Sequence, residues 1–342
     1  MPKILLKKVP YEIDKRLRLY LKKYGREMKL PIMYADLLRY SEGISLYDKY
    51  GQDTLWISLL YSQDDLQHIN LALKQIYAIL RANGDMSVMQ HLYVDRIDLC
   101  LYGNSKPFRI RVVNKINDNF DYFYIKNADA SRIYGLELEH LLSPNRISYV
   151  VDENTLIEEH IAGIPGAEFF DNYLKVGRVE NEIRLAKEFV KFNERCFVRL
   201  LGDMHSSNYV IEIMPDFEDI HYRIRAIDFD QQSYEARKSI YLPQYFKQNM
   251  PIIEVGLKHM TPTTVRQYQK EERAMIASRI RYQHTQVKDI LNCMTKAKLS
   301  KPGSVAILRQ ELADHYGDDR FLECKKMGEL VKASLDLVVE RN

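Results

Sequence analysis

The sequence lacks any apolar run close to the roughly 18 to 20 residues that would span a bilayer. Its opening stretch, "MPKILLKKVPYEIDKR", is too charged to contain the apolar core of a signal peptide. We therefore expect a cytoplasmic protein without a membrane span. The four cysteines lie far apart and form no C-x-x-C pair, which argues against both a zinc site and a disulfide framework.

Charge of one sign is not in large excess, because the net charge is only +3 over 342 residues. The first 40 residues nevertheless carry 11 Lys/Arg against 4 Asp/Glu. Such a basic segment could meet nucleic acid, an anionic membrane surface or an acidic partner. A solvated helix face is the simpler interpretation, so nucleic acid is not an expected partner. The length allows two domains of ordinary size.

The first 90 residues are expected to form an N-terminal α/β extension. Apolar residues at helical spacing over 11–24 end at Gly25, and residues 54–61 ("TLWISLLY") are rich in β-formers. A second helix is predicted to begin after a capping Ser62 or Asp64 and to end near Gly84.

The segment 91–161 is predicted to form a small antiparallel sheet with one helix. Apolar and polar residues alternate along "RIDLCLY" and "FRIRVV", and turn residues separate three consecutive strands. One helix follows, entered through Asp129 or Ser131 and ended before Pro144, and two more strands come after it. Residues 162–342 are predicted to be mainly helical, except for a hairpin formed by 209–214 and 222–227.

A polar loop with Asp203, His205 and Asn208 comes directly before the first hairpin strand, and Asp228 follows the second. A register with Met214 opposite Tyr222 would set Asn208 opposite Asp228. The Cβ atoms of directly paired residues lie about 5 Å apart, so an amide oxygen and a carboxylate could share one hard cation.

These ligands would suit magnesium, with coordination positions left for phosphate oxygens. Asp203 would then face the bound phosphates without ligating the metal. Its expected task is to accept a hydrogen bond from an attacking hydroxyl group.

The order of "LGDMHSSN" and "AIDFD" resembles the catalytic loop and metal-binding strand end of the protein-kinase-like fold. The branch that it resembles includes aminoglycoside phosphotransferases and choline kinases, which write the loop as H-G-D-x-H-x-x-N. The resemblance implies that Asp203 is the catalytic base, that Asn208 is catalytic and holds metal, and that Asp228 is the principal metal ligand. His205 would support the loop. Leu201 departs from the pattern, because the family usually has histidine there.

The same resemblance implies a phosphate-gripping lysine on the third strand and a glutamate on the following helix that holds it. Lys126 ends the predicted third strand, with Lys115 as its nearest rival, and Glu137 is the predicted partner of Lys126. Glu137 lies on the expected inward stripe of the helix, whereas Glu139 is expected to point away. The stripe consists of Ile133, Leu136, His140 and Leu141.

The segment "LIEEHIAGIPG" resembles the strand that connects the two lobes, so the backbone of Glu159, His160 and Ile161 is expected to pair with adenine. The carboxylates of Glu158 and Glu159 are expected to be half surface charge. A G-x-G-x-x-G phosphate loop is absent, since the turn "YGNSKP" has only Gly103.

We therefore predict an α+β, two-lobed protein-kinase-like fold: an N-terminal α/β extension (1–90), an N-lobe with a small antiparallel sheet and one helix (91–161), and a mainly helical C-lobe (162–342). The predicted function is an ATP- and magnesium-dependent phosphotransferase acting on a hydroxyl group of a small molecule. No A-P-E signature follows "DFDQQ", so a small acceptor is preferred over a protein. The alternatives are a HipA-like protein serine kinase, whose loop is D-x-H-x-x-N, and a catalytically inactive pseudokinase-like binding module.

Overall fold

The computed structural model describes residues 8–82, 84–101, 105–217 and 219–342, so Gly103 lies outside the described residues. The fold is α+β, with an antiparallel sheet and a mainly helical part, as predicted. Contacts between residues divide the chain into two units. Unit 1 comprises residues 1–129 and 147–160, and unit 2 comprises residues 130–146 and 161–342.

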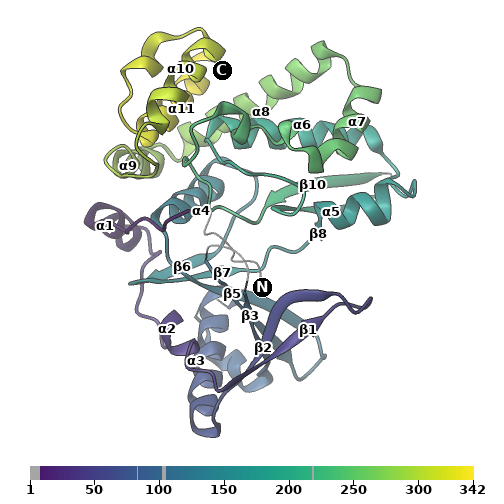
Figure 1. Ribbon diagram of the computed structural model, residues 1–342, viewed down its shortest axis with the longest axis vertical. Helices are drawn as coiled ribbons and strands as arrows, with labels where there is room; N and C mark the ends of the chain where they lie inside the picture. Colours follow the sequence, from purple (N-terminus) through teal and green to yellow (C-terminus); the bar gives the residue numbers. More distant parts are fainter. Residues whose placement is uncertain (1–7, 83, 102–104, 218) are drawn as a thin grey trace. The chain divides into compact units, whose positions relative to one another are not determined.

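Unit 1 is built on an antiparallel sheet of seven strands in the order β1-β2-β3-β4-β5-β7-β6 (Figure 1). The three predicted consecutive strands are confirmed as β3 to β5, and the two after the helix as β6 and β7. Residues on both sides of position 90 share this sheet, because β1 pairs with β2 and β2 with β3. The strands are β1 (Glu42–Tyr47), β2 (Asp53–Leu60), β3 (Leu92–Cys100), β4 (Phe108–Asn114), β5 (Phe120–Asn127), β6 (Tyr149–Asp152) and β7 (Thr155–Glu159).

Helix α3 (Gln63–Arg81) packs its apolar side against the sheet. Its predicted start is confirmed, since the Ser62 hydroxyl accepts a hydrogen bond from the first turn. Leu73 and Ile76 of α3 share one buried core cluster with Phe108 and other strand residues. Burial of each such aliphatic side chain contributes about 1.5–3 kcal/mol. The other helices of unit 1 are α1 (Lys15–Lys23), α2 (Tyr34–Leu37) and a 3₁₀ helix at Met86–His91.

Part of the basic N-terminal segment serves the packing of unit 1. The buried ammonium group of Lys8 lies 2.5 Å from a carboxylate oxygen of Asp129. The guanidinium group of Arg26 lies 4.6 Å from the ring centroid of Tyr149. These cations are therefore engaged within the unit, whereas the charged side of α1 faces solvent.

Unit 2 is mainly helical, and its small sheet has the order β10-β9-β8 (Figure 1). Throughout the described ranges, every helix is too short or too polar to cross a membrane. The strands are β8 (Ile164–Pro165), β9 (Tyr209–Pro215) and β10 (Ile220–Ala226). The α-helices are α4 (Ala130–Leu142), α5 (Gly166–Phe169), α6 (Glu182–Val198), α7 (Met250–His259), α8 (Pro262–Tyr282), α9 (His284–Met294), α10 (Ser304–Tyr316) and α11 (Met327–Arg341). Short 3₁₀ or π turns lie at Phe170–Leu174, Lys238–Tyr241, Pro243–Tyr245, Lys247–Asn249 and Asp319–Glu323.

The predicted hairpin is confirmed as β9 and β10, but its predicted register is wrong by one residue. Tyr222 pairs with Ile213, one position earlier than expected. Beyond the last paired residues, the amide of Ile227 donates a hydrogen bond to the carbonyl of Asn208 over 3.0 Å. Asn208 therefore stands opposite Ile227 and not opposite Asp228.

The observed register places apolar residues together on one face of the hairpin. Ile224 pairs with Ile211, and all pairs on this face are apolar. The expected register would have set Ile224 opposite Glu212. Because a one-residue shift moves every side chain to the other face, burial of the apolar set decides the register. These pairs are Ile220 with Pro215, Tyr222 with Ile213, Ile224 with Ile211, and Ala226 with Tyr209.

Helix α4 begins and ends as predicted, but it is buried on every side except at His140. Glu139, which was expected to point away, is 2% exposed and pairs with Arg199. Glu137 is also buried, and it accepts a hydrogen bond from the side-chain amide of Gln286 over 2.9 Å. A helix that is packed all round has no outward face for charged residues, so its periodicity does not identify which of them are buried.

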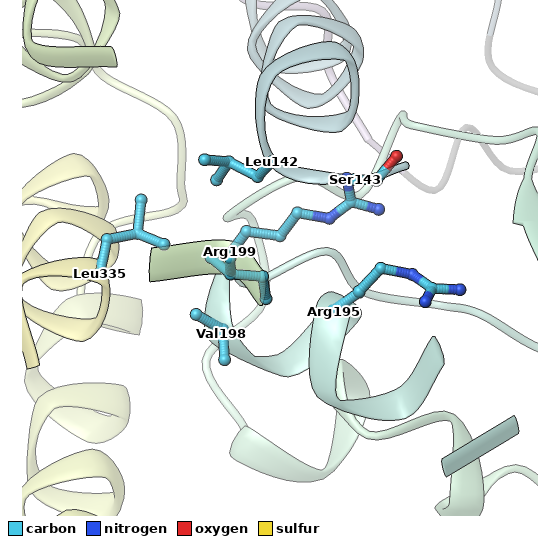
Figure 2. A pocket seen from close by; sticks show the side chains of 7 residues that line it. Leu142, Ser143, Arg195, Val198, Arg199 and Leu335 are labelled. Carbon is cyan, nitrogen blue, oxygen red and sulfur yellow. The ribbon is translucent and has the colours of Figure 1, made fainter. Parts of the chain in front are cut away.

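A narrow gap inside unit 2 is lined by two buried arginines, Arg195 and Arg199 (Figure 2). The Arg199 guanidinium reaches toward Ser143, and the gap has no volume for a water molecule. Arg195 forms an ion pair with Glu188 over 2.7 Å. The gap is therefore part of a buried ion-pair network and has no room for a ligand.

Candidate functional site

The polar loop at residues 199–208 joins α6 to β9 and is held by backbone hydrogen bonds to two later segments. The amide of Gly202 donates to the carbonyl of Gln231 over 3.2 Å, and the amide of Asp203 donates to the carbonyl of Ile240 over 3.0 Å. A Cβ atom at Gly202 would lie 3.1 Å from the Ile240 side chain. Glycine at this position therefore permits the close approach that places Asp203.

Leu201, where the resembled family has histidine, is fully buried and forms an isolated β-bridge with Gln232. The Gln232 side-chain amide donates to the carbonyls of Arg199 and Leu200 over 2.5 and 3.3 Å. The amide of Ser233 donates to the carbonyl of Leu200 over 2.8 Å. Apolar packing and a glutamine thus brace the start of the loop.

Asp203 itself has a left-handed backbone, with φ at 62°. Its carbonyl accepts hydrogen bonds from the His205 amide over 2.9 Å and from Nδ2 of Asn208 over 2.7 Å. Aspartate and asparagine tolerate this conformation better than most residues, although it still costs about 1–2 kcal/mol. The loop is thereby closed between Asp203 and Asn208. Nδ2 of Asn208 faces the loop.

Asp228 follows the hairpin, as predicted, and lies beside Asp230 and Arg132. Nη1 of Arg132 donates to Oδ1 of Asp228 over 2.9 Å and to Oδ1 of Asp230 over 2.8 Å. The amide of Asp230 donates to Oδ1 of Asp228 over 3.0 Å. The Arg132 side chain is 2% exposed, whereas that of Asp228 is 37% exposed. One buried cation thus joins two carboxylates, one of which reaches solvent.

The approach of α4 to this segment depends on a small residue. A Cβ atom at Gly135 would lie 2.9 Å from Cβ of Phe229 and 3.2 Å from Cβ of Gln232. The hydroxyl of Ser131 donates to the Gln232 carbonyl over 2.5 Å. Helix α4 and the D-F-D segment (Asp228–Asp230) therefore pack closely within unit 2.

The donor atoms of this region fit a hard cation such as Mg²⁺. Asn208, Asp228 and Asp230 offer amide and carboxylate oxygens, which are the ligands that magnesium prefers. In the part of the chain that the structure describes, no three or more His, Cys, Asp and Glu residues are grouped so that they could hold a metal. A magnesium ion bound here would therefore need water or phosphate oxygens to complete its coordination. Arg132 already engages Oδ1 of both carboxylates.

Lys126 ends β5, as predicted, and lies in unit 1. Its Nζ donates to Oε2 of Glu158 over 2.8 Å, and both side chains are buried. The pairing follows from the register of β5 and β7. Tyr124 stands directly opposite Glu158, and Lys126, two residues further along β5, is the diagonal neighbour of Glu158 on the same face. The expectation that Glu158 is surface charge is wrong. The partnership of Lys126 with Glu137 stays a prediction.

The three residues predicted to pair with adenine lie at the end of β7 and just after it. The Glu159 carboxylate accepts a hydrogen bond from Arg81 over 3.0 Å. Nδ1 of His160 lies 3.3 Å from the Tyr124 hydroxyl, and burial lowers the pKa of His160. Ile161 is buried. The predicted role of their backbone stays a prediction.

The sequence prediction missed two residues of the candidate site, Arg132 and Asp230. The signal for Asp230 was its position two residues after Asp228, directly after a strand. Two carboxylates close to buried surface require a counter-charge. Arg132, on a helix predicted to be partly buried, was the available cation.

Replacing Arg132 with methionine is expected to destabilise the protein by about 3 kcal/mol, because the buried guanidinium group that joins Asp228 to Asp230 would be lost. Mg²⁺ should then raise the midpoint of thermal unfolding more in the variant than in the wild type, since a divalent cation can replace the guanidinium group. Thermal unfolding in Mg²⁺ and in EDTA measures both effects. Arg178→Met, which removes an exposed arginine, is the control. An equal response to Mg²⁺ in all three proteins would contradict the inference that the Arg132 guanidinium group neutralises Asp228 and Asp230.

No family model matches the chain, and no curated protein matches it.

Proposed function

We propose that the protein is an ATP- and magnesium-dependent phosphotransferase that transfers the terminal phosphate of ATP to a hydroxyl group of a small molecule. The observation that best supports this proposal is Asp203. It is a partly exposed carboxylate in a strained loop that Asn208 closes, and Asp228 follows on the adjoining hairpin. The resemblance of "LGDMHSSN" and "AIDFD" to kinase-like loops supports the same conclusion.

In this proposal the residues divide the work of phosphoryl transfer between a base and a metal site. Asp203 accepts the proton of the attacking hydroxyl group and orients its oxygen in line with the terminal phosphorus. The bond to the bridging oxygen breaks, and ADP leaves. Asn208 and Asp228 would hold magnesium, which would neutralise charge on the phosphates. Lys126 contacts the phosphates in the same proposal.

A small-molecule acceptor is proposed because the chain has no A-P-E signature after "DFDQQ". A protein serine hydroxyl would undergo the same chemistry, as in the HipA-like alternative. A screen of small alcohols, sugars and aminoglycosides, set beside generic protein substrates, separates these acceptor classes.

A second candidate is a pseudokinase-like binding module without catalysis. It is favoured by Arg132, whose guanidinium group joins Asp228 to Asp230. The guanidinium group neutralises the negative charge of the two carboxylates, so that no metal is required to do so. Under this alternative, nucleotide would bind without magnesium, or not at all.

Thermal unfolding with and without ATP and Mg²⁺ tests the proposal. A ligand present at 100 times its dissociation constant stabilises the native state by about 2.7 kcal/mol, so the unfolding midpoint should rise by several degrees. Asp228→Ala should lose the part of the rise that depends on Mg²⁺. The control, Glu254→Ala, removes an exposed carboxylate on α7 and should keep the full response.

The outcomes separate the two candidates. A rise that requires Mg²⁺ and is absent from Asp228→Ala supports the phosphotransferase and justifies the acceptor screen. A rise with ATP in EDTA that Asp228→Ala retains supports the binding module. No rise at millimolar nucleotide overturns the phosphotransferase and leaves only a binding module that holds no nucleotide.

A further inference from the structure

A cavity of about 560 Å³ lies within unit 2, apart from the residues of the candidate site. It is bounded by the segment 297–303 that joins α9 to α10, by the first turns of α10, and by the segment 324–327 at the start of α11. Small-molecule sites usually have volumes of about 300–1,000 Å³. The cavity is thus large enough for a ligand of several functional groups.

The side chains around this cavity are strongly basic. Among the described residues that line it, none is acidic, and five carry a positive charge. Lys298, Lys301, Lys325 and Lys326 are exposed, and Arg309 is partly buried. These cations come from three separate segments. The positive potential is therefore focused on the cavity and does not follow a single helix face.

The nearest carboxylates do not cancel this charge across the cavity. Oε2 of Glu329 accepts hydrogen bonds from the backbone amides of Lys325 and Lys326 over 2.6 and 3.2 Å. The Glu329 carboxylate thus binds backbone amides at the start of α11. Burial raises the pKa of the Cys324 thiol to about 11, and the charges of Glu329 and Glu323 contribute to the same rise. Neither glutamate lines the cavity.

The floor of the cavity combines apolar side chains with backbone amides. Leu299 and Met327 are buried and line it. Helix α10 begins beside it after Gly303, whose φ is 84°, and no side chain caps its first amides. A ligand seated here would meet positive charge at the rim and apolar surface below.

We propose that this cavity binds a small anion that carries two or more phosphate groups. Five cationic residues lining one cavity match several negative charges at close spacing, and phosphate oxygens accept charge-assisted hydrogen bonds from lysine and arginine. The concave shape favours a compact ligand over a nucleic acid strand, which would require an extended basic groove.

The cavity also has a physical connection to the segment after the D-F-D residues. Nζ of Lys301 lies 5.2 Å from the ring centroid of Tyr234. On α10, Glu311 accepts hydrogen bonds from Arg237 over 2.8 Å and from the amide of Lys238 over 2.6 Å. A phosphorylated ligand that draws Lys301 toward itself would compete with its contact on Tyr234.

Sodium tripolyphosphate, with EDTA present to exclude metal, is the probe. Isothermal titration of the full chain should show saturable binding that weakens as the salt concentration rises. Lys298→Gln/Lys325→Gln should weaken the affinity by about 10-fold or more, because two cations that contact phosphate are lost. Both lysines are exposed, so the unfolding midpoint of this variant should stay close to that of the wild type.

The matched control is Lys22→Gln/Lys288→Gln, which removes the same charge from α1 and α9 outside the cavity. Unchanged affinity in this control, together with the loss in the cavity variant, supports the proposal. Three results would overturn it: no saturable binding by the wild type, equal weakening in the control, or full affinity in the cavity variant. Tighter binding of a short oligonucleotide than of tripolyphosphate would also overturn it, in favour of nucleic acid.

Discussion

Asp203→Asn is expected to lower the rate of phosphoryl transfer by about 10³-fold, in the middle of the range that general bases contribute. Asparagine cannot accept the proton of the attacking hydroxyl group. It does tolerate the left-handed backbone at this position, where φ is 62°, so the loop should keep its shape. The stabilisation by ATP and Mg²⁺ should remain, because Asp203 does not hold the metal in the proposed mechanism. Turnover of ATP and of the acceptor, measured beside thermal unfolding, checks both parts.

A suitable control is Asp216→Asn, which changes an exposed aspartate in the hairpin turn by the same single atom. Its turnover should equal that of the wild type. Wild-type turnover by Asp203→Asn would exclude Asp203 as the base. Loss of the ATP response in that variant would instead mean that Asp203 serves binding.

The sequence predicts local structure best where one pattern acts alone. The alternation along β3, β4 and β5 identifies three strands, and Ser62 marks the start of α3 because its hydroxyl caps the helix. The edge strand β1 is harder to predict, since most of its side chains are exposed and its alternation has no buried face.

Long-range pairing limits what the sequence predicts about the candidate site. Its loop residues are recognisable because they are close in sequence. Arg132 and Asp228 are 96 residues apart, and no local pattern joins them. The hairpin register likewise depends on which face is buried, and the predicted register with Met214 opposite Tyr222 was wrong by one position. The candidate catalytic residues could thus be proposed from sequence, whereas the buried arginine beside Asp228 could not.

Helix α4 shows the same limit for charged residues. A pattern-based interpretation treats a glutamate off the apolar stripe as solvated, yet Glu139 is buried beside Arg199. The favourable partner lies directly after the last residue of α6, so the sequence around Glu139 carries no sign of it. Burial of this pair has a large expected effect on stability.

Arg199→Leu is expected to lower the free energy of unfolding at neutral pH by about 3–5 kcal/mol, the usual cost of leaving one partner of a buried ion pair alone. The side chains of Arg199 and Glu139 are each 3% exposed, and the adjoining gap lined by Arg195 and Ser143 has no volume for a water molecule (Figure 2). Bulk solvent therefore does not reach the Glu139 carboxylate in the wild type. Arg195 also stabilises the Glu139 carboxylate, so the loss should fall near the lower end of the range.

The pH dependence of this loss identifies its cause. Burial raises the pKa of Glu139, but the charge of Arg199 and hydrogen bonds outweigh burial, so the pKa lies below its ordinary value of 4.5. In the wild type, Glu139 therefore contributes stability above pH 4.5 that is lost as the pH falls through its lowered pKa. Without Arg199, burial dominates and the pKa of Glu139 rises. Protonation of Glu139 then removes the buried, unpaired charge from the variant. The difference in the free energy of unfolding between the variant and the wild type should therefore shrink as the pH falls toward 4.5.

Denaturant unfolding of both proteins across this pH range measures the difference. The double variant Arg199→Leu/Glu139→Leu should recover much of the loss at neutral pH, because no charge is then left buried and unpaired. A loss in Arg199→Leu that does not change with pH would mean that the packing of the arginine stem, rather than its charge, stabilises this part of unit 2. The double variant would in that case be no more stable than the single one.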